Sequence, residues 1–214
     1  DAARRAAAIR RLVGTVAAAC LTLLLVNCAV VQRDVPRPQT SAWADPAQTA
    51  LGRAATTQLS AHPDASGFHL LDSGLDALSM RAGLADSAER TLDLQYYALH
   101  EDASTQLLID RVVRAAERGV RVRLLVDDLY AVGKDLHLAA LASGPNIEVR
   151  VFNPFMRRGA FGLSRLFEFL GDTTRLNRRM HNKLWIADNA AAVIGGRNLG
   201  DAYFGTADGS NFID

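Results

Sequence analysis

The stretch Met180-His-Asn-Lys-Leu-Trp-Ile-Ala-Asp-Asn-Ala-Ala-Ala-Val-Ile-Gly-Gly-Arg-Asn198 contains two short apolar runs separated by a polar turn. The runs are residues 183–187 and 191–194, and Asp188-Asn189-Ala190 lies between them. Runs of this length joined by Asp and Asn predict a β-hairpin, because both residues favour tight turns. The stretch therefore predicts two adjacent antiparallel strands.

The residues before the hairpin alternate between strand-like and helix-like patterns. Apolar runs, some of them alternating with polar residues, predict strands at 68–71, 92–96, 120–127 and 147–152. Apolar residues at helical spacing predict helices at 72–87, capped by Asp72, and at 104–118, 134–142 and 163–170. Strands that alternate with helices predict an α/β sandwich with a mixed, largely parallel sheet.

The chain begins with a pattern that is typical of an export or membrane-anchor signal. Within residues 1–31, four arginines at positions 4, 5, 10 and 11 precede an apolar run that begins at Leu12. The run is near the lower limit of about 17–25 residues for a bilayer span. Two interpretations stay open: a lipoprotein signal after which Cys28 is lipidated, or an uncleaved transmembrane anchor. Both predict a protein attached to a membrane of the cell envelope.

Residues 32–66 are predicted to form a linker. They contain four of the six prolines among Ser, Thr, Gln and Ala, and a short helix is expected around 47–59. The folded domain is expected at 67–214. Because the first residue is Asp1 and the last residues resemble the start of a strand, we expect a piece of a longer protein that is incomplete at its C-terminus.

Charge and cysteine content narrow the class of protein. Removing residues 1–28 takes four arginines and one aspartate away from 24 basic and 23 acidic residues, which leaves a net charge of −2. A nucleic-acid partner is therefore not expected, since sequence-independent binding needs a basic face. Both cysteines, Cys20 and Cys28, lie in the N-terminal apolar segment, so disulfides do not stabilise the domain.

The residues at the two ends of the hairpin stretch are candidates for catalysis and for anion binding. His181 and Lys183 are two positions apart on one predicted strand, so their side chains share a face. An imidazole can attack phosphorus, and a nearby ammonium neutralises the charge that builds on the phosphoryl oxygens. Gly195 and Gly196 let the backbone approach an anion, and the Asn198 amide can donate to it. The set predicts a phosphate site with a nucleophile that needs no metal or cofactor.

Other features have competing interpretations. Asp127 and Asp128 end a predicted strand, where a helix cap or the rim of the site is favoured over a metal site because no cluster of His or Cys supports a metal. Tyr96 and Tyr97 either line the pocket or belong to the core. The segment 153–169 is rich in Phe, which predicts either a rim that faces lipid or a packed insert. Arg175, Arg178 and Arg179 either attract anionic lipid headgroups or form a solvated cluster in a loop.

The motif His181-x-Lys183-x4-Asp188, followed by Gly195-Gly196-x-Asn198, resembles the signature of the phospholipase D superfamily. Other segments make the chain similar to the bacterial cardiolipin synthases of the C type, namely residues 92–97, 115–128, 174–181 and 198–204. The resemblance covers residues 67–214 and implies one half of the usual duplicated phospholipase D-like fold.

The resemblance also implies a mechanism. His181 would attack a phosphodiester to form a phosphohistidine, with Lys183 and Asn198 holding the phosphate. Asp188 matches the acid of the motif, although its place in the turn suggests support of the site more than proton transfer. A second motif would protonate the leaving alcohol, but no Lys lies two positions after the other histidines, which are His62, His69, His100 and His137. The second motif must then come from a longer chain or from a homodimer.

The leading interpretation is a phosphatidyltransferase that makes cardiolipin from membrane phospholipids. The alternative is a hydrolase of the same superfamily, either a phospholipase or an exported nuclease, although the acidic balance of the domain and the membrane signal argue against a nuclease. A third interpretation is a catalytically silent fragment bound to the membrane.

Overall fold

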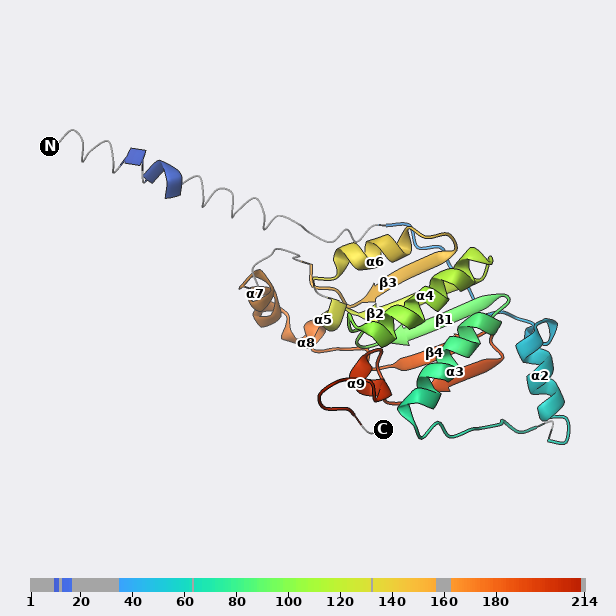
Figure 1. Ribbon diagram of the computed structural model, residues 1–214. Coiled ribbons are helices and arrows are strands. Elements are labelled where there is room, and N and C mark those ends of the chain that lie inside the picture. The colour runs from blue at the N-terminus through green and yellow to red at the C-terminus, as the bar shows by residue number, and fades with distance from the viewer. Residues whose placement is uncertain are drawn as a thin grey trace. The chain divides into compact units, whose positions relative to one another are not determined.

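The structure is a computed structural model, which describes residues 10–11, 13–16, 35–62, 64–131, 133–156 and 163–212 (Figure 1). The chain divides into two compact units. One unit holds Asp1–Pro36 and Pro154–Arg178, and the other holds Arg37–Asn153 and Arg179–Asp214. The second unit contains the hairpin and the motif residues that the sequence singles out.

The predicted signal or anchor, residues 1–31, lies almost entirely outside the described residues, and so does Cys28. Within the part of the chain that the structure describes, no helix is long and apolar enough to cross a membrane. Membrane attachment and lipidation of Cys28 therefore stay predictions.

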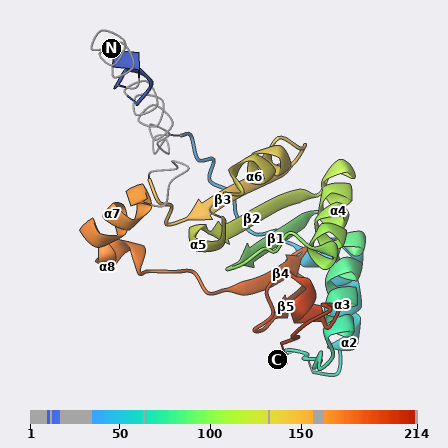
Figure 2. The ribbon, with the colours of Figure 1, turned by 60° about the vertical axis from the view of Figure 1, so that its left-hand side comes forward.

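The second unit is built on one five-stranded sheet with the strand order β3-β2-β1-β4-β5 (Figure 2). The strands are β1 (Thr91–Tyr96), β2 (Arg121–Asp127), β3 (Ile147–Phe152), β4 (Lys183–Ala187) and β5 (Ala191–Ile194). Strands β1, β2 and β3 run parallel, whereas β4 runs antiparallel to β1, and β5 runs antiparallel to β4. The predicted α/β fold with a mixed, largely parallel sheet is confirmed, and so is the hairpin.

Helices α3 and α4 pack against each other on one face of this sheet (Figures 1 and 2). Among the described residues, the named helices are η1 (Pro46–Gln48), α2 (Ala50–Gln58), α3 (Gly74–Ser87), α4 (Ala103–Glu117), α5 (Asp128–Ala131), α6 (Asp135–Ala142), α7 (Leu163–Gly171), α8 (Thr173–Leu176) and α9 (Asp201–Phe204). Apart from the segment 68–71, the helices and strands predicted within residues 67–214 are confirmed to within one or two residues at each end.

The core lies between the sheet and these two helices. Leu92, Leu94 and Tyr96 alternate along β1 and are buried in one cluster with Trp185 of β4. Leu94 and Trp185 are direct partners in the antiparallel register. Because side chains alternate along a strand, the residues between these positions face the other side of the sheet. Tyr96 is therefore a core residue.

Two predictions at the start of the domain are wrong. Residues 68–71 pair with no strand of the described sheet, and the side chains of Phe68 and Leu70 are 90% and 84% exposed. A short apolar run becomes a strand only where a neighbour takes up its backbone hydrogen bonds. Helix α3 is capped by Ser73 and not by Asp72, since Ser73 Oγ accepts a hydrogen bond from the Asp76 N–H at 3.0 Å.

The segment predicted as a linker belongs to the sheet-containing unit from Arg37 onward. Its first residues cross the face of the sheet opposite α3 and α4. There, arginine side chains of β2 and β3 donate to backbone carbonyls, in the pairs Arg150 to Pro38, Arg123 to Thr40 and Arg121 to Ser41. The predicted short helix follows as η1 and α2. Residues 37–42 are exposed but are tied to the sheet by these bonds, and we call this stretch the strap. That residues 32–66 serve as a linker stays a prediction.

A buried carboxylate holds the turn of the hairpin. Asp188 is 0% exposed, and its oxygens accept hydrogen bonds from the N–H groups of Glu89, Arg90 and Thr91 at 3.0, 2.7 and 2.9 Å. Asp188 and Asn189 adopt φ values of 54° and 52°, which is the left-handed backbone of a tight hairpin turn. The carboxylate thereby ties the turn to the beginning of β1 and fixes the end of β4 against it.

We predict that Asp188→Ala lowers the free energy of unfolding by about 3 kcal/mol or more, because three N–H groups lose a charged acceptor. Asp188→Asn keeps one acceptor oxygen and should cost roughly half as much. Urea unfolding followed by circular dichroism measures both. Asp208→Ala, at an exposed position, is the matched control. Equal stability of Asp188→Ala and the parent chain would contradict the role given to this carboxylate.

Candidate active site

His181 and Lys183 meet at the ring of Tyr97. The rings of His181 and Tyr97 lie 4.7 Å apart between centroids, at an interplanar angle of 57°. The Lys183 ammonium lies 5.2 Å from the centroid of the same tyrosine ring and donates to the His181 carbonyl oxygen at 3.0 Å. The imidazole and the ammonium therefore share one small region, as the sequence predicts.

The register of β4 on β1 produces this meeting. Tyr96, the last residue of β1, is paired with Lys183, the first residue of β4. One further hydrogen bond, from the Tyr97 N–H to the Asn182 carbonyl at 3.1 Å, continues the pairing past the end of both strands. His181 precedes the strand and is exposed, whereas Lys183 is only 6% exposed. The prediction that both lie on one strand is thus wrong for His181.

Asp127, at the end of β2, fixes the residues that lead into His181. Its carboxylate is 0% exposed and accepts hydrogen bonds from the Met180 N–H at 2.8 Å and from an Arg179 Nη at 3.2 Å. It also accepts the Leu129 N–H at 2.9 Å, at the start of α5. Both oxygens are therefore engaged by N–H donors, which supports the predicted helix-cap role over a metal site.

Asn198 is held by hydrogen bonds to Ala98 and Tyr203. Its Oδ1 accepts the Ala98 N–H at 3.1 Å, and its Nδ2 donates to the Tyr203 hydroxyl at 3.0 Å. Asn198 is 4% exposed, and Leu99 and Leu199 form a β-bridge immediately beyond it. An amide nitrogen has two N–H groups, so a second donor remains for a ligand.

The glycine pair opens toward solvent. Gly195 and Gly196 follow β5 and are exposed, while the next residue, Arg197, is buried and donates to the Asp72 carbonyl at 3.2 Å. The exposed glycine backbone lies directly before Asn198 in the chain. A contact of Gly195 or Gly196 with phosphate stays a prediction.

Asp188 does not lie with the other motif residues. Because Thr91 contacts Asp188 while Tyr96 pairs with Lys183, the carboxylate is at the opposite end of β1 from the site. At about 3.3 Å per strand residue, the separation is on the order of 16 Å. The structure therefore corrects its grouping with His181 and Lys183 as a catalytic residue and gives it the supporting role that the turn position suggests.

Tyr97 is the site residue that the sequence left undecided. Burial raises the pKa of its hydroxyl above the ordinary value, Tyr130 and Asp127 raise it further, and Arg179 lowers it. The hydroxyl therefore stays protonated at neutral pH and brings no negative charge close to a bound phosphate. The sequence does not predict the role of Tyr203, because no local pattern signals its hydrogen bond to Asn198.

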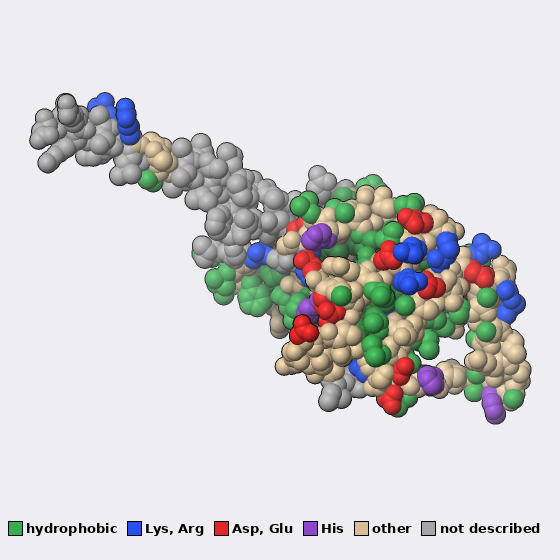
Figure 3. All heavy atoms as spheres, in the orientation of Figure 1, with side chains coloured by type: hydrophobic (Ala, Val, Ile, Leu, Met, Phe, Trp, Pro, Cys, Tyr) green, Lys and Arg blue, Asp and Glu red, His purple; other side chains and the backbone are tan. Residues whose placement is uncertain are grey.

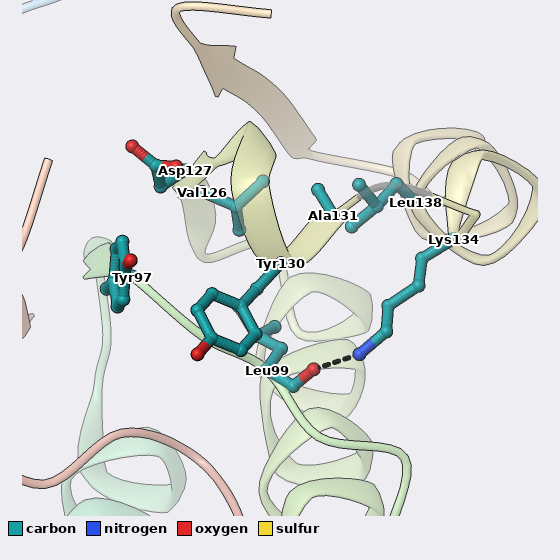
Figure 4. A pocket seen from close by; sticks show the side chains of 8 residues that line it. All are labelled: Tyr97, Leu99, Val126, Asp127, Tyr130, Ala131, Lys134 and Leu138. Atoms are coloured by element: carbon teal, nitrogen blue, oxygen red, sulfur yellow. Dashed lines mark hydrogen bonds between the residues drawn. The ribbon is translucent and has the colours of Figure 1, made fainter. Parts of the chain in front are cut away.

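Tyr97 also lines a small cavity (Figure 4). Tyr130 and Asp127 line it, and the side chain of Lys134 reaches across to donate to the carbonyl oxygen of Leu99. The chain has two lysines, Lys134 and Lys183, and the first one thus ties α6 to the segment after β1. Among the described residues, no three or more His, Cys, Asp or Glu side chains gather as a metal site.

Comparison with known proteins shows the family of this chain. Residues 83–213 match the family model for the cardiolipin synthase, PLD-like domain. The chain belongs to the phospholipase D superfamily. It is 48% identical to cardiolipin synthase C of Escherichia coli K12 over 155 residues, which are 72% of this chain and 32% of that protein. An uncharacterized protein of Helicobacter pylori 26695 is 42% identical over 170 residues, which are 79% of this chain and 34% of that protein.

The chain spans about a third of the length of these two relatives. Among solved structures, NucT from Helicobacter pylori is similar with a TM-score of 0.46 and 18% identity, over 64% of this chain and 76% of that chain.

We predict that Lys183→Arg lowers phosphodiester turnover of the complete protein by about 10²–10³-fold. The compact ammonium is buried between the Tyr97 ring and the His181 carbonyl, and a planar guanidinium needs more room. The matched control is Lys134→Arg, which changes the other lysine and should leave turnover close to that of the parent. Turnover of Lys183→Arg equal to this control would show that only the positive charge matters.

Proposed function

We propose that this chain supplies one half of the active site of a phosphatidyltransferase, which makes cardiolipin from membrane phospholipids through a phosphohistidine intermediate. The observation that carries the proposal is the convergence of His181, Lys183 and Asn198 on Tyr97 and Ala98. We infer that this nucleophile, this cation and this amide donor act together on one phosphoryl group. The 48% identity to cardiolipin synthase C of Escherichia coli supports the choice of substrate class.

The proposed reaction has two steps. A nitrogen of His181 attacks the phosphorus of a phospholipid, and the bond from phosphorus to the headgroup oxygen breaks. The leaving alcohol takes a proton from a general acid. The hydroxyl of an acceptor lipid then gives up its proton and attacks the same phosphorus, which breaks the nitrogen–phosphorus bond and restores His181.

Each group of this chain has a distinct task in these steps. The exposed ring of His181 is accessible to a bulky lipid. Lys183, nearly buried, neutralises the phosphoryl oxygens where water screens charge weakly. The second N–H of Asn198 donates to one of these oxygens. Asp127 and Asp188 act at a distance: the first positions Met180 before the nucleophile, and the second fixes the hairpin.

The general acid is proposed to be the histidine of a second motif. This chain contains one such motif and spans about a third of its curated relatives, so the rest of a longer protein can supply the second. A homodimer that contributes a second His181 is the other arrangement. Attachment to a bacterial envelope membrane, through lipidation at Cys28 or through an N-terminal span, would place the site near its substrates.

A hydrolase is the second candidate function. It would use the same His181 intermediate, with water in place of the acceptor lipid, so the site residues alone do not separate the two. The products do separate them, since transfer gives cardiolipin and hydrolysis gives phosphatidic acid with a free headgroup alcohol. A silent membrane-bound fragment would give neither.

The test is lipid analysis of cells that lack their own cardiolipin synthases and express the complete protein. We expect cardiolipin to accumulate with the parent protein and to be absent with His181→Ala. The matched control, His137→Ala, changes an exposed histidine paired with Glu101 and should still make cardiolipin. Phosphatidic acid without cardiolipin would replace the transferase by the hydrolase. Cardiolipin made by His181→Ala would overturn the proposal.

A further inference from the structure

Helix α7 carries large apolar side chains on its surface. Leu166, Phe167, Phe169 and Leu170 are 51%, 65%, 37% and 64% exposed. These positions are spaced i, i+1, i+3 and i+4, which places them on one side of a helix. Figure 3 shows hydrophobic side chains gathered over this helix. Soluble proteins rarely expose so many large apolar side chains together unless the patch binds another protein, a membrane or a ligand.

The polar side of α7 is fixed within the same unit. Glu168 accepts the Met156 N–H at 2.9 Å and pairs with Arg175 at 2.9 Å. Arg175 also pairs with Asp172 at 2.8 Å, and the Asp172 carboxylate caps α8. These bonds hold the polar side of α7 against its own unit. They leave the apolar side turned outward as a consequence of the fold.

The same segment concentrates positive charge. Residues 154–178 contain five arginines against Glu168 and Asp172, a net charge of +3. The rest of the range 67–214 contains 12 basic and 17 acidic residues, a net charge of −5. The exposed apolar helix therefore lies in the one basic part of an otherwise acidic domain sequence.

A hollow beside α7 and α8 adds polar groups to this surface. It is lined by Phe169, Thr173, Thr174, Asn177 and Arg178. Hydroxyl, amide and guanidinium groups around an aromatic ring suit the phosphate of a lipid headgroup.

We propose that α7 and α8 dock the protein on the surface of an anionic phospholipid bilayer. The side chains of Phe167 and Leu170 enter the boundary between headgroups and acyl chains, while Arg165 and Arg178 meet headgroup phosphates. A bilayer offers an apolar layer and a phosphate layer side by side, which matches both features of this surface. A second copy of the chain would bring a like charge to the same patch, which opposes self-association.

The docking surface goes beyond the proposed function, because it needs neither turnover nor a second motif. Residue 178, the last of the segment that carries this surface, is followed directly in the chain by Arg179, Met180 and His181. Docking would hold the segment that ends in the nucleophile at the surface where phospholipids lie.

The test uses the full chain in vesicles of phosphatidylcholine, with and without phosphatidylglycerol, whose acyl chains carry bromine as a quencher. A tryptophan is introduced by Phe167→Trp, and its fluorescence is taken as the difference from the parent chain. The matched control is Leu136→Trp, at an 86% exposed position on α6. We expect bromolipid to quench the tryptophan at 167 strongly in vesicles with phosphatidylglycerol, and the one at 136 hardly at all.

Two charge variants sharpen the test. In the Phe167→Trp background, Arg165→Gln and Arg178→Gln should each lower the ratio of docked to undocked protein by about fivefold. Absence of quenching at position 167 overturns the proposal. Quenching that is the same without phosphatidylglycerol, or unchanged in both arginine variants, overturns its anionic part. Dimers in detergent that Phe167→Asp abolishes would instead assign this surface to a second copy of the chain.

Discussion

The carboxylate of Asp188 is the constraint on which the site depends. It binds three successive N–H groups at the start of β1, and those residues are 97 to 99 positions away in sequence. This bond sets the register of β4 on the central strand. A slip of one residue would turn every side chain of β4 to the other face. Lys183 would then leave the ring of Tyr97, and Trp185 would leave the core.

The fold could be predicted wherever the signal was local. The apolar runs of the hairpin, with Asp188 and Asn189 between them, gave both strands and the turn, because strand period and turn preference act over neighbouring residues. The run at 68–71 looked the same but lacks a partner strand, and pairing is a property of the whole sheet. The attachment of the strap after Arg37 is invisible in the sequence for a related reason: its carbonyls are held by Arg121, Arg123 and Arg150, which are far away in sequence.

The candidate site, like the fold, is predictable from the sequence only in part. The motif spacing identified His181, Lys183 and Asn198, and the structure brings all three to Tyr97 and Ala98. What the spacing could not give is how they are held. The hydrogen bond from Asn198 to Tyr203 and those from Asp127 to Met180 and Arg179 join segments through space. Asp188 shows the same limit of motif spacing. Its place in the motif suggests a catalytic role, whereas its hydrogen bonds show that it supports the hairpin turn.

The proposed mechanism requires a nitrogen of His181 to attack phosphorus as the nucleophile. Detection of the covalent phosphohistidine intermediate tests this most directly. The complete protein is incubated with a short-chain phospholipid, quenched in base, digested, and analysed by mass spectrometry. We expect a phosphatidyl adduct on the peptide that contains His181. This adduct should be stable in base and lost in acid. Continued turnover with no adduct on His181, or with the adduct on another residue, would contradict it.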